Sequence, residues 1–146
     1  MSKKFISKRY EEFLEEKHEE FILTPKDESL LFFTGCIKGV KGTPYENGVF
    51  HFEMELPTVF PFKPPTFKFT TPIYHPNIRS SGNLSCNILV YEWSPVYAKF
   101  GVLLFAIQSF LDDPDPEEGF ELKNHWIDNL EDARKTARIW TYLYAT

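Results

Sequence analysis

The chain has few of the residues that build disulfide, metal or phosphate sites. It has only two cysteines, Cys36 and Cys86, and no CxxC pair. Two thiols cannot form a disulfide framework, and this spacing does not predict a zinc site. The four histidines show no metal-like pairing, and no glycine-rich phosphate loop occurs. We therefore expect no cofactor, and a reducing compartment, cytoplasmic or nuclear.

Long apolar runs and an excess of positive charge are also missing. The longest apolar run, residues 102–107, has six residues, whereas a membrane-spanning helix needs about 20. Residues 1–9 carry charges but lack the apolar segment of an export signal. With 16 basic and 21 acidic residues the net charge is -5, which argues against nucleic acid or an anionic membrane as the main partner. A protein partner fits better.

Aromatic side chains, in contrast, are plentiful. They make up 17% of the 146 residues, with 15 phenylalanines. A chain of this length can bury a sizeable hydrophobic core. We expect one domain spanning residues 1–146.

The spacing of apolar residues predicts a helix followed by strands. Apolar residues recur at three- and four-residue steps from Ile6 to Phe21, with glutamates between them, which predicts a first helix. After Pro25 come apolar runs at 30–33 and 36–37. Residues 50–56 then alternate between apolar and polar, which predicts a half-buried strand, and a short strand at 66–70 follows several prolines.

The second half of the chain predicts an ordered loop and then helices. Residues 72–95 carry loop signals, and functional groups often lie on loops held by a rigid scaffold. Apolar spacing predicts a helix over 103–111, ended by the residues at 112–116, and a C-terminal helix over 127–144. The fold class is therefore α+β: an N-terminal helix, a four-stranded antiparallel meander, an active-site loop and C-terminal helices. This architecture alone does not name a function.

Several short motifs do point to a function. They are Phe-Pro-Phe-Lys-Pro-Pro at 60–65, His-Pro-Asn-Ile at 75–78, Trp-Ser-Pro at 93–95, the run at 107–116, and Arg-Ile-Trp-Thr at 138–141. In order and spacing they resemble the ubiquitin-conjugating enzyme family, over essentially the whole chain. The resemblance implies an acyl carrier whose cysteine accepts the ubiquitin C-terminus as a thioester and passes it to a substrate lysine.

The same resemblance implies the partners. They are ubiquitin or a ubiquitin-like modifier, an activating enzyme, and a RING or HECT ligase, with the carrier itself a monomer. The short loop between Leu89 and Trp93 suits the ubiquitin group of the family.

The residue at the acyl-acceptor position differs from the family pattern. There the cysteine lies ten residues after the motif histidine and eight before the tryptophan, and both counts lead here to Ser85. Cys86 is one place later. Because side chains alternate along an extended segment, Cys86 shares a side with Leu84 and Ile88 and is expected to be a small core residue.

A serine at this position predicts an inactive or stalled form. A serine hydroxyl needs an adjacent base to become a useful nucleophile, and none is implied, because His75 and Pro76 have a structural role in the family motif. Any adduct on Ser85 would be an oxyester, and its alkoxide is a poorer leaving group than a thiolate.

Two further residues match family site positions. Asn77 corresponds to the amide that either donates to the oxyanion of aminolysis or braces the loop; taken alone, it could simply satisfy loop backbone groups. Glu118 corresponds to an acidic gate residue that positions or deprotonates the incoming lysine, although an exposed acid is often only solvated. Gly119 stands where the family commonly has proline.

Partner surfaces are expected at two loops and on the first helix. The residues that match ligase-contacting positions are Phe62, Ser94, Pro95, Val96, Lys4 and Lys8. Lys3 and Arg9 would join the lysines in meeting an acidic activating enzyme. The alternatives are core packing for Phe62 and a solvated helix face for the basic residues.

Three interpretations share this fold. The chain is a working carrier with Ser85 introduced in place of its nucleophile, a natural non-catalytic variant that acts as a binding module or scaffold, or an enzyme that uses Cys86. The presence of Asn77 and Glu118, which serve aminolysis, favours the first over the second.

Overall fold

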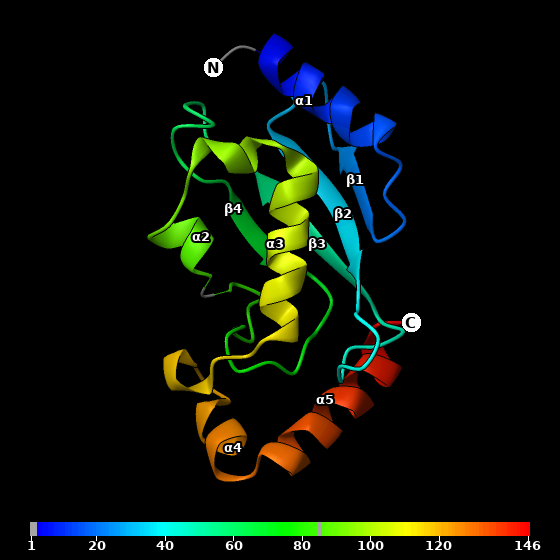
Figure 1. Ribbon diagram of the computed structural model, residues 1–146, viewed down its shortest axis with the longest axis vertical. Coiled ribbons are helices and arrows are strands. Elements are labelled where there is room, and N and C mark those ends of the chain that lie inside the picture. The colour runs from blue at the N-terminus through cyan, green and yellow to red at the C-terminus, as the bar shows by residue number, and fades with distance from the viewer. Residues whose placement is uncertain (1–2, 85) are drawn as a thin grey trace.

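An antiparallel sheet lies between an N-terminal helix and a C-terminal helical region (Figure 1). The computed structural model describes residues 3–84 and 86–146. Helix α1 spans Lys3–Glu15, and the strands follow as β1 (Phe21–Pro25), β2 (Phe32–Lys38), β3 (Val49–Glu55) and β4 (Thr66–Phe69). They pair in chain order, β1-β2-β3-β4, so the expected four-stranded meander is confirmed.

One face of the sheet carries the hydrophobic core. In β3 the side chains of Phe50, Phe52 and Met54 are buried and the residues between them are exposed, as the alternation in the sequence predicts. Phe52 pairs in register with Phe69, and its ring stacks on Phe67 with centroids 4.5 Å apart. This face is therefore the one that another layer must cover.

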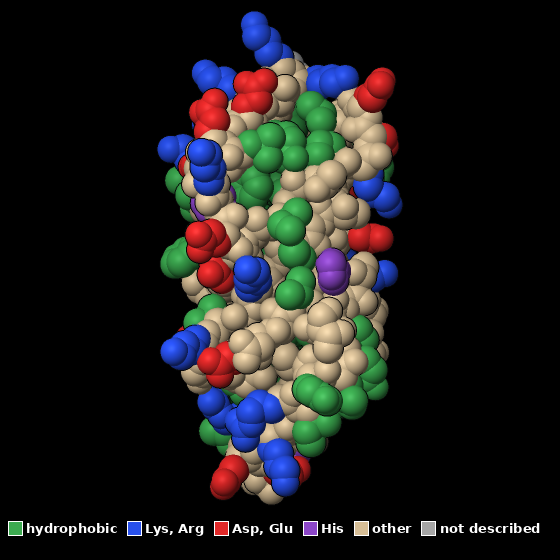
Figure 2. Space-filling model, turned by 90° about the vertical axis from the view of Figure 1, so that its right-hand side faces the viewer, with side chains coloured by type: hydrophobic (Ala, Val, Ile, Leu, Met, Phe, Trp, Pro, Cys, Tyr) green, Lys and Arg blue, Asp and Glu red, His purple; other side chains and the backbone are tan. Residues whose placement is uncertain are grey.

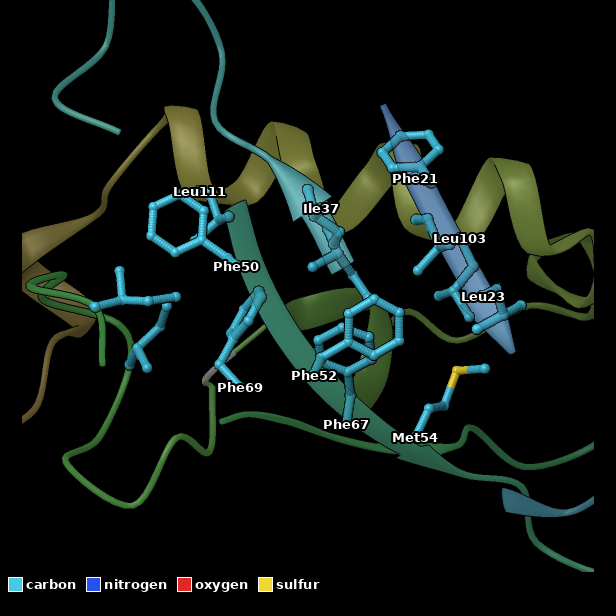
Figure 3. Close-up of a cluster of buried hydrophobic side chains, with 14 of the residues drawn as sticks. Phe21, Leu23, Ile37, Phe50, Phe52, Met54, Phe67, Phe69, Leu103 and Leu111 are labelled. Carbon is cyan, nitrogen blue, oxygen red and sulfur yellow. The ribbon is translucent and has the colours of Figure 1, made fainter. Parts of the chain in front are cut away.

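Helix α3 (Phe100–Asp112) covers that face (Figures 1 and 3). Leu103, Leu104 and Ile107 are each 0% exposed, which confirms the helix predicted from their spacing. Burying a leucine or isoleucine side chain contributes about 1.5–3 kcal/mol. The helix ends at Asp112, just before the loop that completes the candidate site.

The first helix is shorter than predicted. It ends at Glu15, and Phe21 instead begins β1. Lys17 has a φ of 53°, the left-handed conformation that commonly ends a helix. Phe21 is buried in the core, so its apolar character reflects strand packing and the helical interpretation of this residue is wrong.

The second half also departs from the predicted pattern. The helix expected over 127–144 begins later, since α5 spans Leu130–Tyr144 and residues 127 and 128 instead end a separate helix, α4 (Lys123–Asp128). The side chain of Asn129 caps α5 by accepting from the Asp132 N–H at 3.1 Å. The expected loop contains a short helix, α2 (Asn87–Val90), and a 3₁₀ turn, η1 (Pro95–Ala98), begins at its end. A second turn, η2 (Pro116–Glu118), precedes α4.

The face nearest β1 and the C-terminus carries no broad patch of positive charge. Figure 2 shows basic and acidic side chains interspersed there, with hydrophobic side chains between them. Nucleic-acid binding normally needs a patch of like positive charge. Within residues 3–84 and 86–146, every helix is too short or too polar to cross a bilayer.

Candidate active site

His75 is fully buried and holds the loop that carries it. It is 0% exposed, its Nδ1 accepts from the Asn77 N–H at 3.0 Å, and its Nε2 lies 3.2 Å from the carbonyl of Leu111 at the end of α3. A carbonyl only accepts, so the proton lies on Nε2. Burial lowers the pKa of His75 to about 4, so the ring is neutral at pH 7. This geometry supports the expected structural role.

Asn77 braces the loop that follows α3. Its side chain is 1% exposed; Nδ2 donates to the carbonyl of Asp115 at 2.7 Å, and Oδ1 accepts from the Asp115 N–H at 2.8 Å. One amide thus satisfies both backbone groups of a residue 38 positions away. Of the roles considered for Asn77, bracing is present in the structure.

A second contact fastens the same loop, which we call the gate loop (residues 113–122). The Phe120 N–H donates to the carbonyl of Pro76 at 2.9 Å. A Cβ on Gly119 would lie 3.0 Å from the Pro76 oxygen and 2.9 Å from the Pro116 oxygen, so glycine lets the two backbones approach closely. Glu118 is exposed and lies between Asp115 and Phe120, the two residues at which the gate loop is held.

The two loops enclose one side of a cavity. Its volume is about 310 Å³, and its lining includes Asn77, Cys86, Asp113, Asp115 and Glu118. Asn77 and Glu118, which the sequence separates widely, therefore meet at one cavity as expected for site residues. The contribution of Asp115 was missed from the sequence because it pairs with Asn77 through its backbone, which leaves no side-chain signal.

Cys86 lines this cavity but is poorly suited to be a nucleophile. It is 4% exposed, its backbone is extended, and burial raises the pKa of its thiol. The thiolate is the reactive form of cysteine, so this environment suppresses reactivity. The position supports a core role for Cys86. Ser85, the predicted acceptor, lies outside the described residues.

The predicted ligase-contacting residues lie on two loops that are tied together. Phe62 is 77% exposed and Val96 is 54% exposed, so the core-packing alternative for Phe62 is wrong. Pro95 is exposed, and Ser94 caps η1 through the Val96 N–H. The Trp93 Nε1–H donates to the Pro61 carbonyl at 2.8 Å and holds the two loops side by side.

The basic residues of α1 lie at the same end of the molecule as the loop after β3 (Figure 1). Lys4 and Lys8 are exposed on the helix. Arg9 instead pairs with Glu12 at 2.9 Å and lies over the ring of Phe5. Lys3 is exposed as well, so the three lysines are more available than Arg9. Among the described residues, no group of three or more histidine, cysteine or acidic side chains could hold a metal ion.

The carboxyl group of Asp112, at the end of α3, is expected to make stability depend on pH. Burial raises the pKa of its carboxyl from 3.8 to about 6, and Oδ1 has no hydrogen-bond partner among the described residues. The protonated form therefore favours folding below pH 4, and this contribution is lost as the pH rises through 6. We expect Asp112→Asn to raise the free energy of unfolding by about 1 kcal/mol above pH 6, after allowance for partial solvent screening.

This difference should shrink toward zero below pH 4. Urea unfolding of both proteins across pH 3.5–8 measures it, with Asp113→Asn, at the exposed neighbour, as the control. A constant difference at all pH values would show that ionisation of Asp112 is not its cause.

Comparisons with known proteins agree with the fold. A family model described as ubiquitin-conjugating enzyme matches residues 5–141. Ubiquitin-conjugating enzyme E2 13 of Saccharomyces cerevisiae is 35% identical over 144 residues, which cover 97% of this chain and 94% of that protein. Ubiquitin conjugating enzyme E2 B of Dictyostelium discoideum is 39% identical over 121 residues, which cover 82% and 81%.

A solved structure extends the similarity to three dimensions. The E2 domain of a Toxoplasma gondii ubiquitin conjugating enzyme superimposes with a TM-score of 0.87 at 32% identity, and covers 96% of this chain and 98% of that one. The residues that the family model matches include both the loop with His75 and Asn77 and the gate loop. This chain therefore belongs to the ubiquitin-conjugating enzyme family.

Proposed function

We propose that the chain is a ubiquitin-conjugating carrier whose acyl-acceptor position is Ser85, so that this form engages its partners but is inactive or stalled in transfer. The observation that carries the proposal is the meeting of Asn77 and Glu118 at one cavity, which Cys86 lines with a buried thiol. The sequence counts support Ser85 as the acceptor.

The reaction of a carrier of this class has two steps. The activating enzyme passes the ubiquitin C-terminal acyl group to the acceptor, and a lysine amine then attacks the carbonyl carbon. The resulting oxyanion needs hydrogen-bond donors, and the collapse of the intermediate expels the acceptor atom. With serine, the first step lacks an activating base and the second must expel an alkoxide.

The described residues support distinct roles around that acceptor. Asn77 uses one N–H of its amide to hold Asp115, and a primary amide has a second N–H that could donate to an oxyanion. Glu118 presents an exposed carboxylate at the same cavity, where it would attract the lysine amine and take its proton. His75 and Pro76 are buried and would hold the loop.

Partner binding does not require the chemistry to work. Phe62, Pro95 and Val96 are exposed on loops that Trp93 ties together, a surface suited to a RING or HECT ligase. Lys4 and Lys8 would meet the activating enzyme. This exposed surface also favours the second candidate function, a non-catalytic scaffold that positions ubiquitin, a ligase or another carrier. In either role we propose a cytoplasmic or nuclear monomer.

The test is a charging reaction with activating enzyme, ATP and ubiquitin, followed by reductant or hydroxide. An adduct that resists reductant and is cleaved by hydroxide is the oxyester expected on Ser85. Absence of an adduct is expected both for a scaffold form and for a serine too unreactive to be charged, and the Ser85→Cys protein separates these two. An adduct cleaved by reductant would place the nucleophile at Cys86 and overturn the proposal.

A further inference from the structure

A chain of hydrogen bonds joins the loop of His75 to the C-terminal helices. Tyr74 precedes His75, and its hydroxyl contacts Nδ1 of His125 on α4. Nε2 of His125 lies 2.8 Å from Oδ2 of Asp132 on α5. Three segments that are distant in sequence are thus linked through three side chains.

The direction of these hydrogen bonds follows from the chemistry of the groups. A carboxylate only accepts, so Nε2 of His125 carries a proton and donates to Asp132. In the tautomer with its one proton on Nε2, Nδ1 is an acceptor and the Tyr74 hydroxyl donates to it. Burial raises the pKa of Tyr74, so the hydroxyl keeps the proton that this bond needs.

Packing fixes Tyr74 where this bond is made. The residue is 9% exposed, and its ring makes T-shaped contacts with the rings of His125 and Trp140 at centroid distances of 5.6 and 5.2 Å. Its backbone carbonyl accepts from the Tyr45 hydroxyl at 2.8 Å. A rigid Tyr74 makes the hydroxyl a fixed point to which α4 is fastened.

The contacts between the two segments form an ordered series. Asn77 holds Asp115, Pro76 holds Phe120, and Tyr74 holds His125. As the chain is followed backward from Asn77 to Tyr74, the partner residues run forward from Asp115 to His125. Asn77 therefore holds the gate loop near its start, Pro76 holds it near its end, and Tyr74 holds α4. Glu118 lies between the first two fastened points.

We infer that His125 is a positioning residue: by joining Tyr74 to Asp132 it anchors α4 and sets the place of the gate loop and of Glu118 relative to Asn77. The anchor also makes the gate loop depend on α5, since Asp132 holds the His125 ring in the tautomer that accepts from Tyr74. The role in transfer rests on the proposed function, whereas the effect on the loop does not.

The direct test is hydrogen exchange at two backbone amides that report the gate loop, Asp115 and Phe120. Tyr74→Phe removes only the hydroxyl, and we expect protection of both amides to fall about fivefold relative to amides of the β2–β3 ladder, from the loss of one hydrogen bond. His125→Leu should act alike. His125→Gln keeps an acceptor and a donor and should restore much of the protection.

A matched control is available in the other histidine–carboxylate pair. His18 Nε2 lies 2.7 Å from Glu16 Oε1, away from the gate loop, so His18→Gln should leave the relative protection of the two amides unchanged. Unchanged protection in Tyr74→Phe would overturn the inference. So would an equal fall at all amides, because that would show only a loss of global stability.

Activity gives a second, separable readout in a Ser85→Cys background. Tyr74→Phe and His125→Leu should leave charging by the activating enzyme within about twofold and slow discharge to free lysine about fivefold, the value of one hydrogen bond. Equal discharge rates would contradict coupling to transfer. Failure of the Ser85→Cys protein to charge would contradict the proposed function, and hydrogen exchange alone would then decide the inference.

Discussion

Replacement of Ser85 by cysteine is expected to convert a chain that forms no reductant-labile adduct into one that is charged by activating enzyme, ATP and ubiquitin. A cysteine thiol has a pKa of about 8.5, so a useful fraction is thiolate near neutrality, whereas serine needs a base. The thiolate is also the better leaving group when lysine attacks. Because one atom changes and the two side chains have nearly the same shape, the fold should be unaffected.

The measurement is a gel shift with and without reductant, followed by discharge to free lysine. Ser85→Ala should remain uncharged. Adding Cys86→Ala to the Ser85→Cys protein should leave charging intact, since Cys86 is buried and its thiol pKa is raised. If Ser85→Cys neither charges nor discharges, the idea of an enzyme with a substituted nucleophile is wrong.

Replacement of Asn77 by alanine is expected to have the largest effect on both stability and transfer among the described residues of the site. It removes two hydrogen bonds from a buried side chain to the backbone of Asp115. At about 1 kcal/mol for each hydrogen bond, the free energy of unfolding should fall by about 2 kcal/mol. In a Ser85→Cys background, discharge to lysine should slow on the order of a hundred-fold, the usual effect of losing an oxyanion donor.

The variant Asn77→Asp tests the donor half of the amide. It keeps an acceptor for the Asp115 N–H, but its second oxygen would face the Asp115 carbonyl at a buried position, so neither the full stability nor the transfer rate should return. Asn83→Ala, at an exposed asparagine, is the control for urea unfolding and discharge. An Asn77→Ala protein as stable as the original would contradict bracing.

Helices and strands with a regular spacing of apolar residues were predictable from the sequence, whereas helix ends set by a single residue were not. The alternation of Phe50, Phe52 and Met54 and the spacing of α3 match the structure because each pattern reports one buried face. The end of α1 was misplaced because Phe21 fits both helical spacing and strand burial. The break at Asn129 was missed because its cap lies inside a continuous apolar pattern.

In the candidate site, too, some features were predictable from the sequence and others were not. Asn77 and Glu118 were predicted from motif positions, and the structure brings them to one cavity. The fastening of the gate loop was not predicted, since the Asp115 and Phe120 contacts use backbone groups that every residue has. His125 lacked a sequence signal because its partners lie 51 residues before it and seven after it.

Gly119 gives the gate loop an unusual sensitivity to side-chain volume. Its φ of -83° suits any residue, so glycine is needed for space and not for conformation. Proline could adopt this φ but would lose the hydrogen bond from the Gly119 N–H to the Pro116 carbonyl, 3.0 Å in length. The absence of a side chain at position 119 thus sets the distance between the gate loop and Pro76. Each added atom would push the gate loop away from Pro76 and move the Glu118 carboxylate, without changing any charged or hydrogen-bonding side chain.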